Sequence, residues 1–177
     1  MNVTVIKTKI EDVKIFQPEV FNDDRGYLIE SFSEKHYKDH LLNTNFVQDN
    51  ESKSSYGTLR GLHFQEKPFE QAKLVRVIKG EIQDVAVDLR KESKTYKQYV
   101  SVLLNETNKK QLYVPRGFAH GFLVLSDEAI VHYKMDSLYK HEFNNGIRYD
   151  DPKINIKWKL DKSKILISEK DNKLNYL

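Results

Sequence analysis

Asp84-Val85-Ala86-Val87-Asp88-Leu89 carries the clearest structural signal in the chain, because Val85, Val87 and Leu89 fall at every second position. Successive side chains of a β-strand point to opposite faces of the sheet, so these three apolar residues would share one face. The pattern therefore predicts a β-strand with an apolar face that packs against a core.

Runs rich in β-branched and aromatic residues recur on both sides of this strand. The predicted strands are Val3–Ile6, Tyr27–Phe32, Leu74–Ile78, Ile82–Leu89, Tyr99–Leu104, Gln111–Val114, Gly121–Leu125 and Ala129–Met135. Turn-forming residues separate them, as at Lys79-Gly80-Glu81 and Ser126-Asp127-Glu128. Helix is expected only over Glu34 to Leu42, capped by Ser33, while Glu169 to Leu174 is either helical or irregular. Many short strands joined by turns favour an all-β sandwich or barrel, for which the jelly roll is one standard arrangement.

Composition limits the classes of protein that remain open. The chain has 177 residues and no linker or repeat, which predicts a single domain over residues 1–177. It has no cysteine, so disulfides, thiolate catalysis and cysteine-ligated metals are excluded. No run approaches the roughly 18 apolar residues of a membrane-spanning helix, and a soluble cytoplasmic protein is expected. The 29 basic and 26 acidic residues are interspersed, whereas nucleic-acid binding needs a clustered basic face, so neither a membrane nor a nucleic acid is expected as partner.

The segment Gly57-Thr58-Leu59-Arg60-Gly61-Leu62-His63-Phe64-Gln65 is the densest in residues that carry chemistry. Its two glycines permit a bend in a strand or a close approach of two backbones. Strand alternation places Leu62 and Phe64 on one face and His63 and Gln65 on the other. A histidine in such a position is more often structural than catalytic, so this segment alone leaves the role of His63 open.

Four further residues stand out, and each has an ordinary structural interpretation beside a functional one. Lys73 begins an apolar strand, where a solvated lysine is common. Tyr133 shares a strand face with apolar neighbours, as core tyrosines do. His120 lies among small residues in Pro115-Arg116-Gly117-Phe118-Ala119-His120-Gly121-Phe122, which leave space beside it. Asp171, in Ser168-Glu169-Lys170-Asp171, fits a helix-capping or surface residue on pattern alone. None of them is decisive singly.

Taken together, these segments resemble the dTDP-4-dehydrorhamnose 3,5-epimerase family. The segments that carry the resemblance, in the order of the family, are Asp24-Arg25-Gly26 with Glu30, Gly57 to Gln65, Gln71-Ala72-Lys73-Leu74-Val75-Arg76-Val77, Asp84 to Arg90, Pro115 to Phe122, Asp150-Asp151-Pro152 with Trp158, and Ser168 to Asp171. They cover nearly the whole chain. Two segments depart from the family. At Tyr96-Lys97-Gln98-Tyr99 the family usually has an aromatic residue and a glycine, followed by a tryptophan. The segment from Tyr139 to Gly146 lacks the proline and the later glutamate often found there.

This resemblance implies a cupin-type jelly roll that works as a homodimer with exchanged N-terminal strands, without a metal or cofactor. The implied substrate is a nucleotide-diphosphate-linked 4-keto sugar that is inverted at C3, at C5 or at both, in deoxysugar synthesis for a surface polysaccharide. By the same resemblance His63 is the catalytic base, Asp171 orients it, Lys73 lies near the sugar oxygen and Tyr133 is the acid. The residues implied in holding the substrate are Arg25, Glu30, Gln48, Asn50, Arg60, Tyr139 and, lining the pocket, His120.

These residue types suit the implied chemistry. A ketone at C4 acidifies the protons on C3 and C5, because the carbanion that forms delocalises onto oxygen as an enolate. Inversion then needs a base on one face of the ring and an acid on the other, and imidazole and phenol can serve as these. An ammonium group stabilises the enolate oxygen, a carboxylate fixes the tautomer of the base, and guanidinium groups bind a diphosphate.

Three alternatives remain at this stage. A metal-dependent cupin needs several histidines and a carboxylate around one ion, commonly starting from His-x-His, and the six histidines contain no such pair. A non-catalytic cupin that only binds a sugar nucleotide would not need an acid opposite a base. Within the enzyme class, the sequence leaves open inversion of C3 only or C5 only, a GDP-linked 4-keto deoxy-heptose as substrate, and dTDP, GDP or CDP as the nucleotide.

Overall fold

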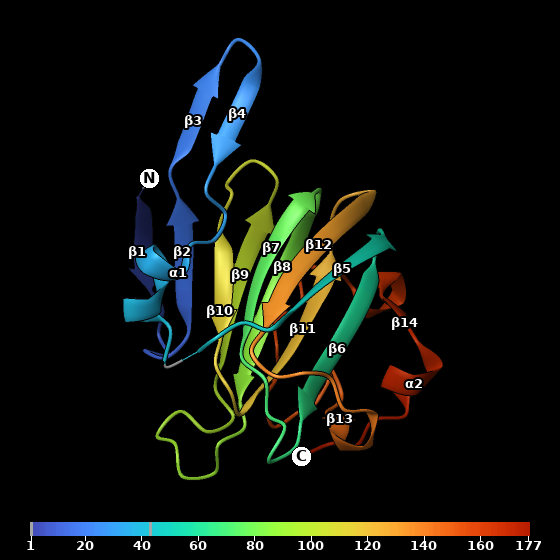
Figure 1. Ribbon diagram of the computed structural model, residues 1–177. Helices are drawn as coiled ribbons and strands as arrows, with labels where there is room; N and C mark the ends of the chain where they lie inside the picture. Colours follow the sequence, from blue (N-terminus) through green and yellow to red (C-terminus); the bar gives the residue numbers. More distant parts are fainter. Residues whose placement is uncertain (1, 43) are drawn as a thin grey trace.

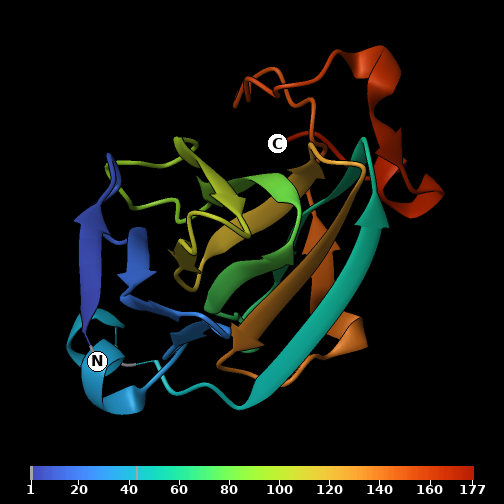
Figure 2. The same ribbon diagram turned by 90° about the horizontal axis from the view of Figure 1, so that it is seen from above.

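The computed structural model describes residues 2–42 and 44–177, which form two β-sheets packed face to face (Figures 1 and 2). The first sheet has the strand order β1-β2-β10-β7-β12-β5, and the second has the order β13-β6-β11-β8-β9, with β14 pairing to β6. Apart from the parallel pair β14 and β6, neighbouring strands are antiparallel. This arrangement confirms the all-β sandwich expected from the alternating runs.

The strands of the first sheet are β1 (Val3–Lys7), β2 (Lys14–Pro18), β5 (Gln48–Ser55), β7 (Lys73–Lys79), β10 (Gln111–Val114) and β12 (Glu128–Met135). Those of the second are β6 (Thr58–Gln65), β8 (Glu81–Asp88), β9 (Tyr99–Asn105), β11 (Phe118–Val124), β13 (Asn144–Gly146) and β14 (Leu166–Ile167). A separate hairpin consists of β3 (Val20–Asp23) and β4 (Gly26–Ile29). The helical segments are α1 (Glu34–Tyr37), η1 (Lys38–His40), η2 (His141–Phe143), η3 (Lys162–Lys164) and α2 (Glu169–Asn172).

Strand β8 is buried on both faces, whereas its sequence predicted one apolar face. Ala86 packs in the core between the two sheets. Val85 and Val87 pack on the opposite side, in a second cluster with Ile154 and Ile156 of the C-terminal segment. The C-terminal segment therefore covers the outer face of the second sheet, where Gln83 bonds to its backbone. Asp84 and Asp88 lie on the inner face of β8 with Ala86.

Several predicted elements have different bounds in the structure. The strand predicted over Tyr27–Phe32 ends at Ile29. The predicted helix ends as an α-helix at Tyr37 and continues as a 3₁₀ turn to His40; Ser33 occupies the cap position without a side-chain capping bond. The second helical segment is confirmed as α2. Strand β5 was not predicted, because its sequence is polar throughout, and it forms as an edge strand by pairing with β12 along its length.

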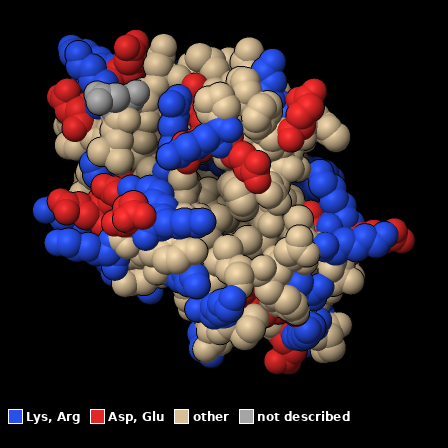
Figure 3. Space-filling view, turned by 90° about the horizontal axis from the view of Figure 1, so that it is seen from below, with Lys and Arg blue, Asp and Glu red and all other residues tan. Residues whose placement is uncertain are grey.

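The hairpin β3–β4 projects beyond the sandwich, at the top of Figure 1. It exposes large apolar side chains: Phe21 is 43%, Tyr27 57% and Leu28 59% exposed. On the face of the molecule seen in Figure 3, basic and acidic side chains lie beside one another and form no single continuous basic surface. Within the described residues, no helix combines the length and apolar character required to cross a membrane.

Candidate active site

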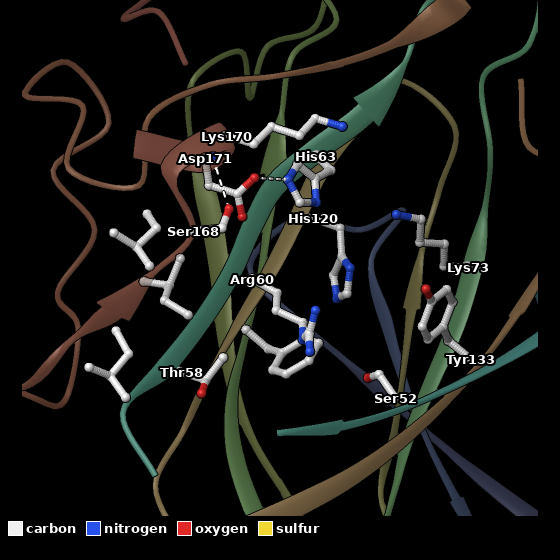
Figure 4. Close-up of a pocket in the computed structure, with 14 residues that line it drawn as sticks. Ser52, Thr58, Arg60, His63, Lys73, His120, Tyr133, Ser168, Lys170 and Asp171 are labelled. Atoms are coloured by element: carbon white, nitrogen blue, oxygen red, sulfur yellow. Dashed lines mark hydrogen bonds and ion pairs between the residues drawn. The ribbon is translucent and has the colours of Figure 1, made fainter. Parts of the chain in front are cut away.

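Both sheets contribute to a cavity of about 540 Å³. The first sheet provides side chains from β5, β7 and β12, while the second provides β6, β11 and β14 together with the start of α2 (Figure 4). The lining residues are Ser52, Thr58, Leu59, Arg60, His63, Lys73, His120, Phe122, Tyr133, Leu166, Ile167, Ser168, Lys170 and Asp171. All four residues proposed as catalytic from the sequence, together with Arg60 and His120, therefore surround one cavity.

His63 and Asp171, 108 residues apart in the chain, are joined by a hydrogen bond of 2.7 Å between Nε2 and Oδ1. Since an ionised carboxylate only accepts hydrogen bonds, Nε2 carries the proton and Nδ1 of the neutral ring is free to accept one. Burial raises the pKa of the Asp171 carboxyl, but three effects outweigh it and hold the pKa below its usual value: the hydrogen bond from His63, the positive charge that this ring carries when protonated, and the backbone amide of Gly61. The pair thus has the arrangement of an oriented general base.

Asp171 itself is neither a surface residue nor the helix cap, so that pattern-based interpretation is wrong. The hydroxyl of Ser168 caps α2 by accepting a bond of 3.1 Å from the backbone amide of Asp171. The capped turn then directs the Asp171 side chain inward, where only 7% of it is exposed.

A bulge in β6 brings Arg60 and His63 to the same cavity. His63 pairs with His120 and Arg60 with Phe122, so three steps along β6 match two steps along β11. In a regular strand, residues three apart point to opposite faces, and the extra residue removes this difference. Gly61 lies at the bulge with φ +125°, and a Cβ there would lie 2.6 Å from the Cα of Gly121. The close approach predicted from the glycines is therefore confirmed.

Lys73 and Tyr133 lie on the first sheet, opposite the His63–Asp171 pair (Figure 4). Their strands are neighbours: Lys73 pairs with Met135, and Tyr133 pairs with Val75. Burial lowers the pKa of Lys73 to about 8, against a smaller opposing effect of the negative charge of Asp84. Lys73 is therefore not the solvated strand-end lysine that its sequence position suggested. Tyr133 packs against the edge of the core and also lines the cavity, which combines the two interpretations of this residue.

Sequence reasoning missed several polar residues at or behind this cavity, of which three matter most for its charge and polarity. Ser52 lies on the unpredicted strand β5, and Lys170 precedes Asp171 in α2. Asp84 is fully buried and its Oδ1 lies 2.7 Å from Nε2 of His120, which makes a second histidine–carboxylate pair. An acidic residue among the apolar residues of a strand predicted to pack on the core was the available signal for Asp84.

The other substrate-binding candidates do not line the cavity of their own chain. Arg25 is at the tip of the β3–β4 hairpin and pairs with Asp23, while Glu30 lies 2.7 Å from His36.

Gln48, Asn50 and Tyr139 form a small group beside the cavity. The Gln48 side chain donates to Asn50 at 3.0 Å and accepts from the Tyr139 amide at 3.3 Å. Asn50 pairs with Tyr133 across β5 and β12, so both residues lie on the same face of the sheet. Within residues 2–42 and 44–177, no group of three or more histidine and acidic side chains is arranged to hold a metal ion.

Comparison with known proteins shows similarity along nearly the whole chain. A family model described as dTDP-4-dehydrorhamnose 3,5-epimerase matches residues 7–177. The dTDP-4-dehydrorhamnose 3,5-epimerase of Methanothermobacter thermautotrophicus is 54% identical over 168 residues, which are 94% of this chain and 90% of that protein. The Escherichia coli protein of the same name is 48% identical over 174 residues, covering 97% and 93% of the two chains.

Solved structures show the same fold. The dTDP-4-dehydrorhamnose 3,5-epimerase of Elizabethkingia anophelis matches with a TM-score of 0.95 at 45% identity, over 99% of this chain and 97% of that one. A dTDP-6-deoxy-D-glucose-3,5-epimerase from Legionella pneumophila, solved in complex with dTDP-4-keto-L-rhamnose, also gives a TM-score of 0.95, at 43% identity over 99% and 93% of the chains. These matches confirm the predicted cupin-type jelly roll.

Proposed function

The chain belongs to the dTDP-4-dehydrorhamnose 3,5-epimerase family, and from this premise we propose how its cavity performs the reaction. The protein is an isomerase of deoxysugar biosynthesis that epimerises a nucleotide-linked sugar. The proposed substrate is a dTDP-linked 4-keto-6-deoxy sugar, inverted at C3 and C5. A relative solved with dTDP-4-keto-L-rhamnose supports this choice over a GDP-linked heptose.

His63 is proposed as the base that removes the proton from the carbon next to the ketone. Its Nδ1 is free because Nε2 donates to Asp171, and the carboxylate stabilises the imidazolium that forms. The electron pair of the broken C–H bond moves into the ring and onto the C4 oxygen, which gives an enolate. Positioned proton transfer of this kind accelerates a reaction by roughly 10²–10⁴-fold.

Tyr133 is proposed to complete the inversion by donating its phenolic proton to the opposite face of the same carbon. It belongs to the sheet across the cavity from His63. Lys73, on the neighbouring strand, is proposed to stabilise the negative charge on the C4 oxygen. The observation that carries the proposal is this combination: a carboxylate-paired imidazole on one sheet, and a phenol and an ammonium group on the other.

The diphosphate is proposed to lie beside Arg60, which provides positive charge at the cavity. Arg60 is held there by a bond of 2.9 Å from its Nε to the Ser54 hydroxyl. The nucleoside would extend over the group formed by Gln48, Asn50 and Tyr139 along the edge of β5.

We expect a homodimer in which the β3–β4 hairpin of one protomer completes the site of its partner. Arg25 and Glu30 do not line the cavity of their own chain, and the hairpin exposes apolar side chains beyond the sandwich. A mixing experiment tests this arrangement. An Arg25→Ala protomer and a His63→Asn protomer each give an impaired homodimer, but the mixed dimer has one intact site, so mixing should restore activity toward about a quarter of the sites. No recovery in mixed dimers of confirmed composition would contradict the exchange.

The proposed chemistry is tested by proton exchange. We expect His63→Asn to reduce deuterium incorporation at C3 and C5 of dTDP-4-keto-6-deoxyglucose by roughly 10²–10⁴-fold, followed by proton NMR in deuterated water. His40→Asn is a suitable control, because His40 is exposed and lies outside the cavity. Exchange at the wild-type rate in His63→Asn would remove His63 from the role of base. Substrate binding by the wild-type protein without any exchange would instead identify a binding module.

A further inference from the structure

Asp84 is a buried carboxylate that the catalytic scheme leaves without a role. It lies in the middle of β8, opposite Phe122 on one neighbouring strand and Val102 on the other, and is 0% exposed. It does not line the cavity, although its partner His120 does. Burying a carboxylate is costly unless it is paired, so the groups that face Asp84 must explain its presence.

Only one of its two oxygens is accounted for by hydrogen bonds. Oδ1 lies 2.7 Å from Nε2 of His120, whose side chain is only 8% exposed. The carboxylate accepts, so His120 carries its proton on Nε2. Oδ2 is buried and has no hydrogen-bond partner in the part of the chain that the structure describes. A full charge with an unpaired oxygen in such a place needs an opposite charge nearby.

The cation placed to supply this charge is the ammonium group of Lys73, which comes from the facing sheet and lines the same cavity as His120, the partner of Asp84. Burial lowers the pKa of Lys73 to about 8, and the negative charge of Asp84 acts against this. The other titratable or charged side chains around the cavity are Arg60, His63, His120, Tyr133, Lys170 and Asp171. Arg60 and Lys170 are cations and give an ammonium group no support. Asp171, the other acid, is already engaged by His63 and by the Gly61 amide.

We propose that Asp84 is a positioning residue that acts through two neighbours, fixing the His120 ring through Oδ1 and serving as the buried counter-ion of the Lys73 ammonium group. A protonated Lys73 brings a positive charge and three N–H donors to a developing enolate, whereas a neutral amine brings no charge and is a weaker donor. Asp84 therefore keeps the enolate-stabilising group in its useful form over the working pH range. The role assigned to the charged Lys73 in catalysis rests on the proposed function. The pairing of Asp84 with Lys73 does not depend on it.

The variant Asp84→Asn separates the charge from the shape. Its amide oxygen can still accept the bond from His120, while the negative charge is gone. Removal of the opposite charge that supports the ammonium group lowers its pKa, so we expect the alkaline limb of kcat/KM to move from near pH 8 to about one unit lower. At pH 8 a shift of one unit corresponds to about a fivefold loss of kcat/KM relative to the wild type, with a smaller loss at pH 6.5.

Asp88→Asn is the matched control, because Asp88 is an equally buried acid on the same strand whose partners lie outside the cavity. It should leave the alkaline limb in place. In the double variant Asp84→Asn with Lys73→Arg, the guanidinium stays charged at all working pH values, and the alkaline limb assigned to Lys73 should disappear.

A measurement without catalysis distinguishes failure of this inference from failure of the proposed function. The Nζ resonance of Lys73 in ¹⁵N-lysine-labelled protein, assigned by its loss in Lys73→Arg, should titrate at least about one pH unit lower in Asp84→Asn than in the wild type. An unchanged titration overturns the inference, whatever the activity. A shifted titration in a protein without epimerase activity would support the pairing and reject the proposed function.

If Asp84→Asn does not fold, Asp84→Ser removes the same charge from a smaller side chain. The Nζ resonance of Lys73 should again titrate at lower pH than in the wild type. A titration at the same pH in both proteins overturns the inference.

Discussion

Replacing Lys73 by methionine should make the protein more stable and nearly inactive. Methionine keeps the length and apolar stem of the side chain but removes the amine. In the folded protein burial lowers the pKa of Lys73 from 10.5 to about 8, against the smaller effect of Asp84. Each unit of pKa corresponds to about 1.4 kcal/mol, so the charged form destabilises the folded state by about 3 kcal/mol.

The direction of the pH dependence follows from the lowered pKa. Below about pH 8 the lysine is protonated in both the folded and the unfolded state, and the folded state bears the full destabilisation. Between about pH 8 and 10.5 the folded protein releases the proton while the unfolded chain keeps it, so the destabilisation decreases. Above pH 10.5 the lysine is neutral in both the folded and the unfolded state, and the destabilisation disappears. Methionine leaves Asp84 without a counter-ion, so the gain at pH 7 is at most about 3 kcal/mol.

Urea denaturation at pH 7 and near pH 10.5, at one protein concentration, measures this difference. The free energy of unfolding of Lys73→Met should exceed that of the wild type at pH 7 and equal it near pH 10.5, while kcat falls by roughly 10²–10³-fold. Lys79→Met is the control on the same strand: hydrogen bonding to Glu128 raises the pKa of Lys79, so its removal should give no stabilisation at pH 7. A Lys73→Met protein that is no more stable than the wild type at pH 7, or whose advantage persists at pH 10.5, refutes the reasoning.

Three further predictions concern the acid, a structural carboxylate and the bulge. Tyr133→Phe should lower product formation by roughly 10²–10⁴-fold while solvent deuterium still exchanges at the carbon facing His63, measured by NMR; unchanged product formation would contradict the two-face scheme. Burial raises the pKa of Asp88, but hydrogen bonds from Arg90, Ser93 and Thr95 lower it to about 2. Asp88→Asn should therefore be about 2 kcal/mol less stable than the wild type above pH 4. Urea titrations should show this difference in stability shrinking as the pH falls toward 2. Gly61→Ala should destabilise the fold by about 3 kcal/mol or more, against about 1 kcal/mol for Gly26→Ala. Both glycines have φ near +130°, but only at Gly61 would the added methyl group meet neighbouring atoms. Equal losses of stability in the two variants would show that packing at the bulge contributes little.

Alternation predicted most strands of the sandwich, because a half-buried strand must repeat its apolar residues with a period of two. The same signal could not find β5, whose residues from Gln48 to Ser55 are all polar. This strand lies at an edge and its position is set by pairing with β12, which is a long-range property. Alternation also could not predict that β8 is buried on both faces, since the second cover comes from residues near Ile154 and Ile156, about 70 positions further along.

The candidate site was predicted by residue type, but its geometry was not. Strict alternation in β6 places Arg60 and His63 on opposite faces, and only the bulge at Gly61 brings them to one cavity. The partner of His63 is 108 residues away, and its local sequence suggested a helix cap. Such long-range pairings depend on how the sheets meet, so resemblance to a family can point to them while local physical reasoning cannot.

Asp84 and Asp88 are two buried carboxylates whose hydrogen bonding differs, and the difference indicates a functional role for Asp84 and a structural role for Asp88. They lie on the same face of β8, four residues apart, and both are 0% exposed. Asp88 accepts bonds from the guanidinium of Arg90 and from the Ser93 and Thr95 hydroxyls, which use both of its oxygens and tie the following loop to the strand.

Asp84 accepts one bond and leaves the other oxygen unpaired among the described residues. Folding alone would favour an apolar residue there, since a half-satisfied buried carboxylate lowers stability. Lys73 is a half-buried cation, and it also destabilises the fold near neutral pH. Two unfavourable charges on facing sheets are hard to explain by folding, whereas a reaction that passes through an oxyanion requires a cation held charged in a poorly hydrated place.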